Sequence, residues 1–307
     1  MPHKDATPMS GDLPVKGLLG DRCNVSQQWI QTPETRLSYW EYEGSGQPLI
    51  FCHGAGLCGR TWDPVITHLD GGYRVLAWDA RGHGDSSTPE YPNAYGWQGF
   101  SKDLLAMLDQ LGLEKDVLAV GHSGGASTLA HAALLDPHRF AGMLWFDAII
   151  ADAAFFASAQ ELAQRTLRRR ESLPSLAYAR SHFGGKAPMN RWTAAALDAY
   201  LQYGFTVDDG GAIHLKCRPS IEAQVYGSGG YTPLLERLCE IRTPVLLVTG
   251  SESYMTAFAE EQHRRLAHSE LLVLPNTGHF IPQEQPLRCA ELITAWARGL
   301  CPSVEGS

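Results

Sequence analysis

Short apolar runs alternate along this chain with stretches whose leucines recur at helical spacing, and this alternation strongly constrains the fold. The helical pattern is clearest over residues 100–113. Several of the runs are nearly continuous in apolar residues, which is typical of strands buried on both faces. The runs are RLSYWEYEG (36–44), PLIFCHG (48–54), RVLAWDA (74–80), DVLAVGH (116–122), GMLWFDA (142–148), PVLLVTG (244–250) and ELLVLPN (270–276). Such a chain is expected to form a mainly parallel α/β sheet that binds ligands outside the carboxyl ends of its strands.

The alternation is interrupted between residues 151 and 235, where helical patterns precede a Gly-rich stretch. Strand-like rhythm resumes only at Pro244. Because the sheet needs the strands on either side, this segment is predicted to be a mainly helical cap inserted over the sheet. We therefore predict a loosely ordered N-terminal arm over 1–35, a core over 36–150 and 236–300, and a cap over 151–235.

The composition excludes several classes of partner. Apolar residues make up 44% of the chain and charged residues 19%, which is typical of a compact globular protein. The formal net charge of −8 predicts no overall attraction to nucleic acid or to an anionic membrane. The one basic cluster, formed by Arg165, Arg168, Arg169 and Arg170, is predicted to be a solvated helix face. The sequence does not determine an oligomeric state.

The cysteines and the N-terminus bear on localisation. The seven cysteines are odd in number, scattered, and without C-x-x-C spacing, which is typical of reduced thiols. Neither the apolar core of a signal peptide nor a run of roughly 18 apolar residues is present. A soluble, cytoplasmic protein is therefore expected.

The most specific motif is Gly121-His122-Ser123-Gly124-Gly125, which directly follows one apolar run and directly precedes a helical pattern. A sharp turn from strand to helix strains the backbone at the serine and holds its hydroxyl above the sheet. Small residues two positions before and after the serine allow neighbouring elements to approach closely. Ser123 is therefore the candidate nucleophile, and a purely structural Gly-rich turn is the alternative.

A serine hydroxyl needs a base to remove its proton, and His279 is the candidate among twelve histidines. It follows a late apolar run in the turn NTGHF, at the strand-end level of the serine. His122 is expected to pack beside the nucleophile. His53 and His83 lie in loops on the same rim, and we expect both to organise their loops by hydrogen bonding.

The oxyanion formed during attack needs two backbone N–H donors. Gly124 is expected to supply one, because it follows the nucleophile. The second is expected from the loop His53-Gly54-Ala55-Gly56, whose small residues let the backbone face a ligand. Ala55 is the first choice for this donor and Gly56 the alternative.

Taken in order, HGAG (53–56), WDARGHGDS (78–86), GHSGG (121–125) and NTGHF (276–280) resemble the motifs of the α/β-hydrolase superfamily. The resemblance spans roughly residues 36–299. It implies the α/β-hydrolase fold, with a mostly parallel eight-stranded sheet flanked by helices and a helical cap. In that family the turn matched by residues 81–86 is structural, so we assign it no catalytic role.

At the acid that orients the histidine, the sequence departs from the commonest family pattern. In most members an aspartate stands three residues after the glycine that ends the strand matched by PVLLVTG, and here that position is Ser253. Glu252 stands one residue earlier and is an alternative. Zearalenone lactonases instead carry the acid after the preceding strand of the sheet, which here corresponds to Asp147, 24 residues after Ser123. We predict that Asp147 is the acid.

The resemblance and the residues together predict a serine hydrolase that cleaves a small-molecule carboxylic ester or lactone through an acyl-enzyme, without a metal or organic cofactor. A hydrolase of carbon–carbon bonds in ring-cleavage products uses the same fold and triad and is one alternative. A non-catalytic ligand-binding protein of the same fold is another. Epoxide hydrolases and haloalkane dehalogenases place an aspartate at the turn, and Ser123 argues against both.

Overall fold

The computed structural model describes residues 24–69, 72–91, 93–228 and 233–300. At its centre is an eight-stranded sheet in the order β1-β2-β4-β3-β5-β6-β10-β11. β2 runs antiparallel to both of its neighbours, and the other paired strands are parallel. This confirms the predicted mostly parallel sheet. The strands are β1 (Val25–Gln31), β2 (Arg36–Tyr42), β3 (Gln47–Cys52), β4 (Tyr73–Trp78), β5 (Val117–His122), β6 (Phe140–Phe146), β10 (Val245–Gly250) and β11 (Ser269–Leu274).

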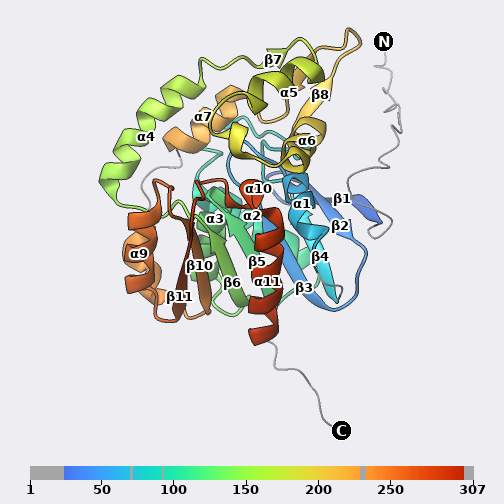
Figure 1. The fold of residues 1–307 in the computed structure, drawn as a ribbon. Helices are drawn as coiled ribbons and strands as arrows, with labels where there is room; N and C mark the ends of the chain where they lie inside the picture. The colour runs from blue at the N-terminus through green and yellow to red at the C-terminus, as the bar shows by residue number, and fades with distance from the viewer. Residues whose placement is uncertain (1–23, 70–71, 92, 229–232, 301–307) are drawn as a thin grey trace.

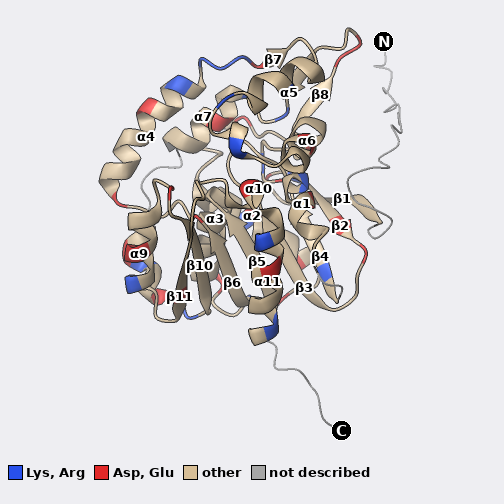
Figure 2. Ribbon diagram, viewed as in Figure 1, with Lys and Arg blue, Asp and Glu red and all other residues tan. Residues whose placement is uncertain are grey.

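Helices cover both faces of this sheet (Figure 1). Along β3, Ile50 packs with α2 (Trp97–Gln110) and α3 (Gly124–Leu135) on one face. Its neighbours Leu49 and Phe51 pack with α1 (Asp63–Ile66) and α11 (Pro286–Leu300) on the other. The central strands are therefore apolar on both faces, and charged residues lie mainly on surrounding helices and loops (Figure 2). Among the helices of the described ranges, none is long and apolar enough to cross a membrane.

The described residues between 151 and 235 lie over the carboxyl ends of the central strands (Figure 1). This segment is mainly helical, and it also contains a small antiparallel sheet in the order β7-β9-β8, which the sequence did not predict. Strands of two or three residues are too short to show a period of two. Its elements are α4 (Ala153–Thr166), β7 (Ser172–Leu173), α5 (Leu176–Gly184), η3 (Met189–Arg191), α6 (Ala194–Tyr203), β8 (Phe205–Val207), β9 (Ile213–Leu215), α7 (Pro219–Ser228) and the start of α8 (Leu234–Arg237).

The prediction of a loosely ordered arm up to residue 35 is wrong for residues 25–31, which form the edge strand β1. This strand pairs with β2 along its whole length, from Val25 opposite Tyr42 to Gln31 opposite Arg36. Because an edge strand is exposed, its side chains lack the apolar pattern by which buried strands are found. The rest of the predicted arm, residues 1–23, lies outside the described residues.

Four further elements complete the core. η2 (Gly59–Trp62) and α1 follow β3, whereas η4 (Leu238–Glu240) precedes β10. α9 (Thr256–Arg265) connects β10 to β11, and α10 (Ile281–Glu284) follows β11. The loops after β3, β5, β6, β10 and β11 all leave the sheet at the same edge, because these strands are parallel. The predicted site residues lie in these loops.

Candidate active site

Ser123 occupies the turn between β5 and α3, with φ at 55°, in the left-handed region that non-glycine residues rarely adopt. Its backbone N–H donates to the Phe146 carbonyl at 2.9 Å. A Cβ on Gly121 would lie 2.6 Å from the Ala126 nitrogen, and one on Gly125 would lie 2.2 Å from the Cys52 carbonyl oxygen. Neither position can hold a larger residue unless the backbone moves. The backbone around Ser123 therefore packs too closely for a residue larger than glycine at position 121 or 125.

His279, in the loop between β11 and α10, lies between Ser123 and Asp147. Its Nε2 is 3.0 Å from Ser123 Oγ, and its Nδ1 is 2.5 Å from Asp147 Oδ2. The His279 side chain is 10% exposed and the Asp147 side chain is fully buried. With Nδ1–H donating to the carboxylate, the unprotonated Nε2 faces the serine hydroxyl and can accept its proton.

Asp147 directly follows β6 and also has a positive φ, of 50°. Thr249 Oγ1 donates to its Oδ1 at 2.6 Å, and Gly250 N–H donates to the same oxygen at 3.4 Å. Ser253 Oγ donates to Oδ2, the oxygen that also contacts His279. These donors replace the water that a buried carboxylate loses.

The alternative acid, Glu252, does not contact His279. Its half-exposed carboxylate pairs instead with Arg191 of η3. Arg191 also bonds to Glu284 Oε2 at 3.0 Å and to the Asn276 carbonyl at 2.7 Å. Glu252 therefore belongs to a polar network that joins the cap to the loop carrying His279.

The contribution of Ser253 was missed by the sequence reasoning, which treated this residue only as the absence of the usual acid. Its hydroxyl accepts from the Met255 N–H at 3.0 Å, which orients the hydroxyl proton toward Asp147. The available signal was the residue itself, because a serine at this position can donate to a neighbouring carboxylate.

The other three histidines that were predicted near the nucleophile, His122, His53 and His83, bond to backbone groups. His122 Nε2 donates to the His279 carbonyl at 2.9 Å, and burial together with the nearby His279 lowers its pKa to about 3. His53 Nε2 accepts from the Ala80 N–H at 3.0 Å, and burial lowers its pKa to about 3. Burial also lowers the pKa of His83 to about 4. All three rings are therefore neutral at pH 7.

Ala55 and Gly124 approach each other beside the nucleophile. A Cβ on Gly124 would lie 3.9 Å from the Ala55 nitrogen, and one on Gly54 would lie 3.2 Å from Ser123 Cβ. The loop after β3 thus lies against the turn that carries Ser123. The backbones of Ala55 and Gly124 are therefore close neighbours beside Ser123.

Gly56, the alternative donor, has φ of +76°. A Cβ at Gly56 would lie 2.9 Å from Glu222 Oε1, so this residue packs against the cap. The Ala55 nitrogen instead lies beside Gly124, so Ala55 stays the predicted second donor.

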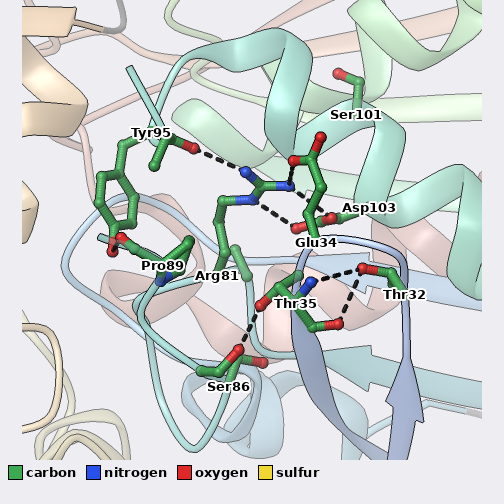
Figure 3. A network of polar contacts seen from close by, with 12 residues as sticks. Thr32, Glu34, Thr35, Arg81, Ser86, Pro89, Tyr95, Ser101 and Asp103 are labelled. Carbon is green, nitrogen blue, oxygen red and sulfur yellow. Dashed lines mark hydrogen bonds and ion pairs between the residues drawn. The ribbon is translucent and has the colours of Figure 1, made fainter. Parts of the chain in front are cut away.

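The turn over residues 81–86 is held by buried charges (Figure 3). The Arg81 guanidinium donates to both oxygens of Asp103, each at 2.7 Å, and to Glu34 Oε2 at 3.0 Å. At the start of the turn, the buried Asp79 accepts from the N–H groups of Gly59 and Asp85, and burial raises its pKa to about 6. These contacts join loops of the core.

An aromatic group extends from His279 to the cap. The Tyr254 ring lies 4.8 Å from the His279 ring and stacks on Phe155 of α4 at 6.4 Å. Phe155 also contacts Phe258 at 5.3 Å between ring centroids. One side of the site is therefore apolar. Within the described ranges, no three His, Cys, Asp or Glu side chains are grouped as metal ligands.

The chain belongs to the alpha/beta hydrolase family, whose model matches residues 49–292. The predicted superfamily is thereby confirmed, and the protein is a hydrolase of this fold.

Among known proteins, the chain is similar to the non-heme chloroperoxidase CPO-A1 of Kitasatospora aureofaciens. The two are 28% identical over 259 residues, covering 78% of this chain and 86% of that protein. An epoxide hydrolase of Caballeronia sordidicola is 38% identical over 99 residues, covering 32% of this chain and only 30% of that protein. In structure, the chain resembles E-2-(acetamidomethylene)succinate hydrolase with a TM-score of 0.78 and 22% identity, covering 89% of this chain and 99% of that chain. The last similarity concerns the fold alone.

Proposed function

We propose that this hydrolase cleaves carboxylic esters or lactones through an acyl-enzyme on Ser123. The observation that carries the proposal is the position of His279, 3.0 Å from Ser123 Oγ and 2.5 Å from Asp147 Oδ2. A serine activated by a histidine that a carboxylate orients is the arrangement used for acyl transfer.

In the acylation step, Ser123 Oγ attacks the ester carbonyl carbon while its proton passes to His279 Nε2. Asp147 stabilises the resulting imidazolium, and the Ala55 and Gly124 N–H groups bind the oxyanion. Each such donor contributes about 2.7–4 kcal/mol in the transition state. The intermediate collapses when His279 returns the proton to the leaving alkoxide, which departs as an alcohol and leaves an acyl-serine ester.

In the deacylation step, His279 accepts a proton from water, and the hydroxide attacks the acyl carbon. The second tetrahedral intermediate releases the carboxylic acid, and the proton returns to Ser123 Oγ. For a lactone, the alcohol and the acid are parts of one product.

The residue at the turn argues against an epoxide hydrolase, because those enzymes attack with an aspartate and Ser123 stands in its place here. The epoxide hydrolase match covers only about a third of each protein, so it does not support assigning epoxide hydrolysis to this chain.

The test is covalent labelling combined with a substrate panel. A fluorophosphonate is expected to add one phosphonyl group to the wild-type protein in intact-mass spectrometry and none to Ser123→Ala. The panel comprises short-acyl, long-acyl, aryl and lactone substrates, together with a dienoic ketone that only a carbon–carbon bond hydrolase cleaves. Faster turnover of the dienoic ketone than of every ester and lactone would replace this proposal. A folded protein that is not labelled would instead favour the ligand-binding alternative.

A further inference from the structure

Arg169 forms an ion pair with a buried carboxylate of the cap. The segment between α4 and β7 is rich in arginine (Figure 2), and Arg169 Nη1 lies 2.5 Å from Glu222 Oε2 of α7. The Glu222 side chain is only 8% exposed, whereas that of Arg169 is 37% exposed. Tyr226 Oη donates to the other Glu222 oxygen at 2.9 Å. Glu222 is thus a buried carboxylate that holds the partly exposed side chain of Arg169.

This pair lies next to the loop that carries a proposed oxyanion donor. A Cβ on Gly56 would lie 2.9 Å from Glu222 Oε1, so the carboxylate packs directly on the residue after Ala55. Tyr226 Oη bonds to the same oxygen, Glu222 Oε1, at 2.9 Å. The Glu222–Tyr226 pair therefore lies directly beside the loop that follows β3.

The chemistry of the pair favours an anionic ligand. Both Glu222 oxygens already have partners, so this carboxylate has little capacity left for a substrate. Arg169 uses one nitrogen for Glu222, and its remaining N–H groups have no partner among the described residues. A guanidinium edge of this kind matches the two oxygens of a carboxylate. Residues 161–171 contain four arginines and two glutamates, so this segment carries a net positive charge.

We propose that Arg169, held by Glu222, binds a carboxylate that the substrate carries at a distance from the ester bond being cleaved. The proposal rests on the proposed esterase function and narrows its substrate class to esters or lactones bearing a second, anionic group. A purely structural clamp between α7 and the segment after α4 is the competing explanation for the ion pair.

The test compares two p-nitrophenyl esters of equal acyl length, the anionic hydrogen glutarate and the neutral pentanoate. The measured quantity is the selectivity, the ratio of kcat/KM for the anionic ester to kcat/KM for the neutral ester. Arg169→Met is expected to lower this ratio about tenfold or more, mainly through the KM of the glutarate, because a charge-assisted hydrogen bond is lost. Arg168→Met, a neighbouring arginine with no carboxylate partner among the described residues, is expected to change it less than about twofold.

Arg169→Met leaves Glu222 buried without its cation, so loss of folding must be separated from loss of binding. The variant Arg169→Met/Glu222→Gln removes both charges and keeps an acceptor for Tyr226. Under the proposal, the double variant has wild-type thermal stability and the same low selectivity as Arg169→Met. Wild-type selectivity in the double variant, or an equal loss for both esters in Arg169→Met, would overturn the subsite and favour the clamp.

Failure of the subsite is distinguishable from failure of the proposed function. An enzyme that reacts with fluorophosphonate and hydrolyses both esters, but whose selectivity does not depend on Arg169, refutes only the subsite. A protein that neither reacts with fluorophosphonate nor hydrolyses either ester refutes the esterase function, and the subsite with it.

Discussion

Replacing Asp147 by asparagine tests the proposed triad at its least conventional member. Both carboxylate oxygens accept hydrogen bonds, Oδ1 from Thr249 and Gly250 and Oδ2 from Ser253 and His279. An asparagine must therefore turn its NH2 group toward at least one donor, whichever way the amide is oriented. The substitution also removes the negative charge that stabilises the imidazolium.

The expected loss is large. If the NH2 group faces His279, the ring adopts the tautomer whose Nε2 is protonated and can no longer accept the serine proton. If the amide oxygen faces His279, the tautomer is kept and only the charge is lost. Wrong-tautomer asparagine substitutions in serine triads lower kcat about 10⁴-fold, so we expect a fall of three to four orders of magnitude, or about 4–5.5 kcal/mol in the barrier.

The assay is steady-state hydrolysis of a p-nitrophenyl ester, with thermal unfolding measured in parallel to establish that the variant is folded. Glu252→Gln is the matched control, because this carboxylate is 48% exposed and pairs with Arg191. We expect it to keep kcat within about twofold of the wild type. A folded Asp147→Asn protein with more than a tenth of the wild-type kcat, or an equal loss in Glu252→Gln, would refute the assignment.

Three further outcomes are expected. Ser253→Ala removes a hydrogen-bond donor to Asp147 and should lower kcat about three- to tenfold with little change in KM. Ser253→Thr keeps a hydroxyl and should retain activity. An equal loss of activity in both variants would contradict a role for the hydroxyl. Gly124→Ala places a methyl group 2.6 Å from the Trp97 ring and should displace the proposed oxyanion donor. We expect kcat for ester hydrolysis to fall roughly 100-fold. A wild-type kcat would exclude Gly124 from this role. The His122 pKa of about 3 lies below the unfolded value of 6.5, so its contribution to stability is present above pH 6.5 and is lost as the pH falls. Between pH 7 and pH 5, the free energy of unfolding measured with denaturant should fall by about 2 kcal/mol less in His122→Gln than in the wild type. An equal fall in the two proteins would count against a neutral buried ring.

The features that the sequence predicted best are local. Gly121, Ser123 and Gly125 belong to one continuous strand, turn and helix, so the pattern of a few residues specified the turn. The sheet was also predictable, because strands buried on both faces are apolar throughout. The edge strand β1 and the short cap strands lack that signal.

Contacts between distant parts of the chain could not be read in this way. The sequence predicted Asp147 as the acid but kept Glu252 as an alternative, because the choice depends on how the ends of β6 and β10 meet the His279 loop. The parallel register of β6 and β10, with Phe146 opposite Val248, places Asp147 beside Thr249 and within reach of His279. Arg169 is a similar case, since its partner lies 53 residues along the chain.

The network around Arg191 holds one edge of the cap against the core. Arg191 binds the nearly buried Glu284 and the Asn276 carbonyl, which ties η3 of the cap to both ends of the loop carrying His279. By contrast, α4 buries only Ala163 and Thr166 of its 14 residues against the described part of the chain. The exposed α4 is therefore expected to open locally more often than the edge of the cap that is held at Arg191. Amide hydrogen exchange should then be faster along α4 than along the loop that carries His279.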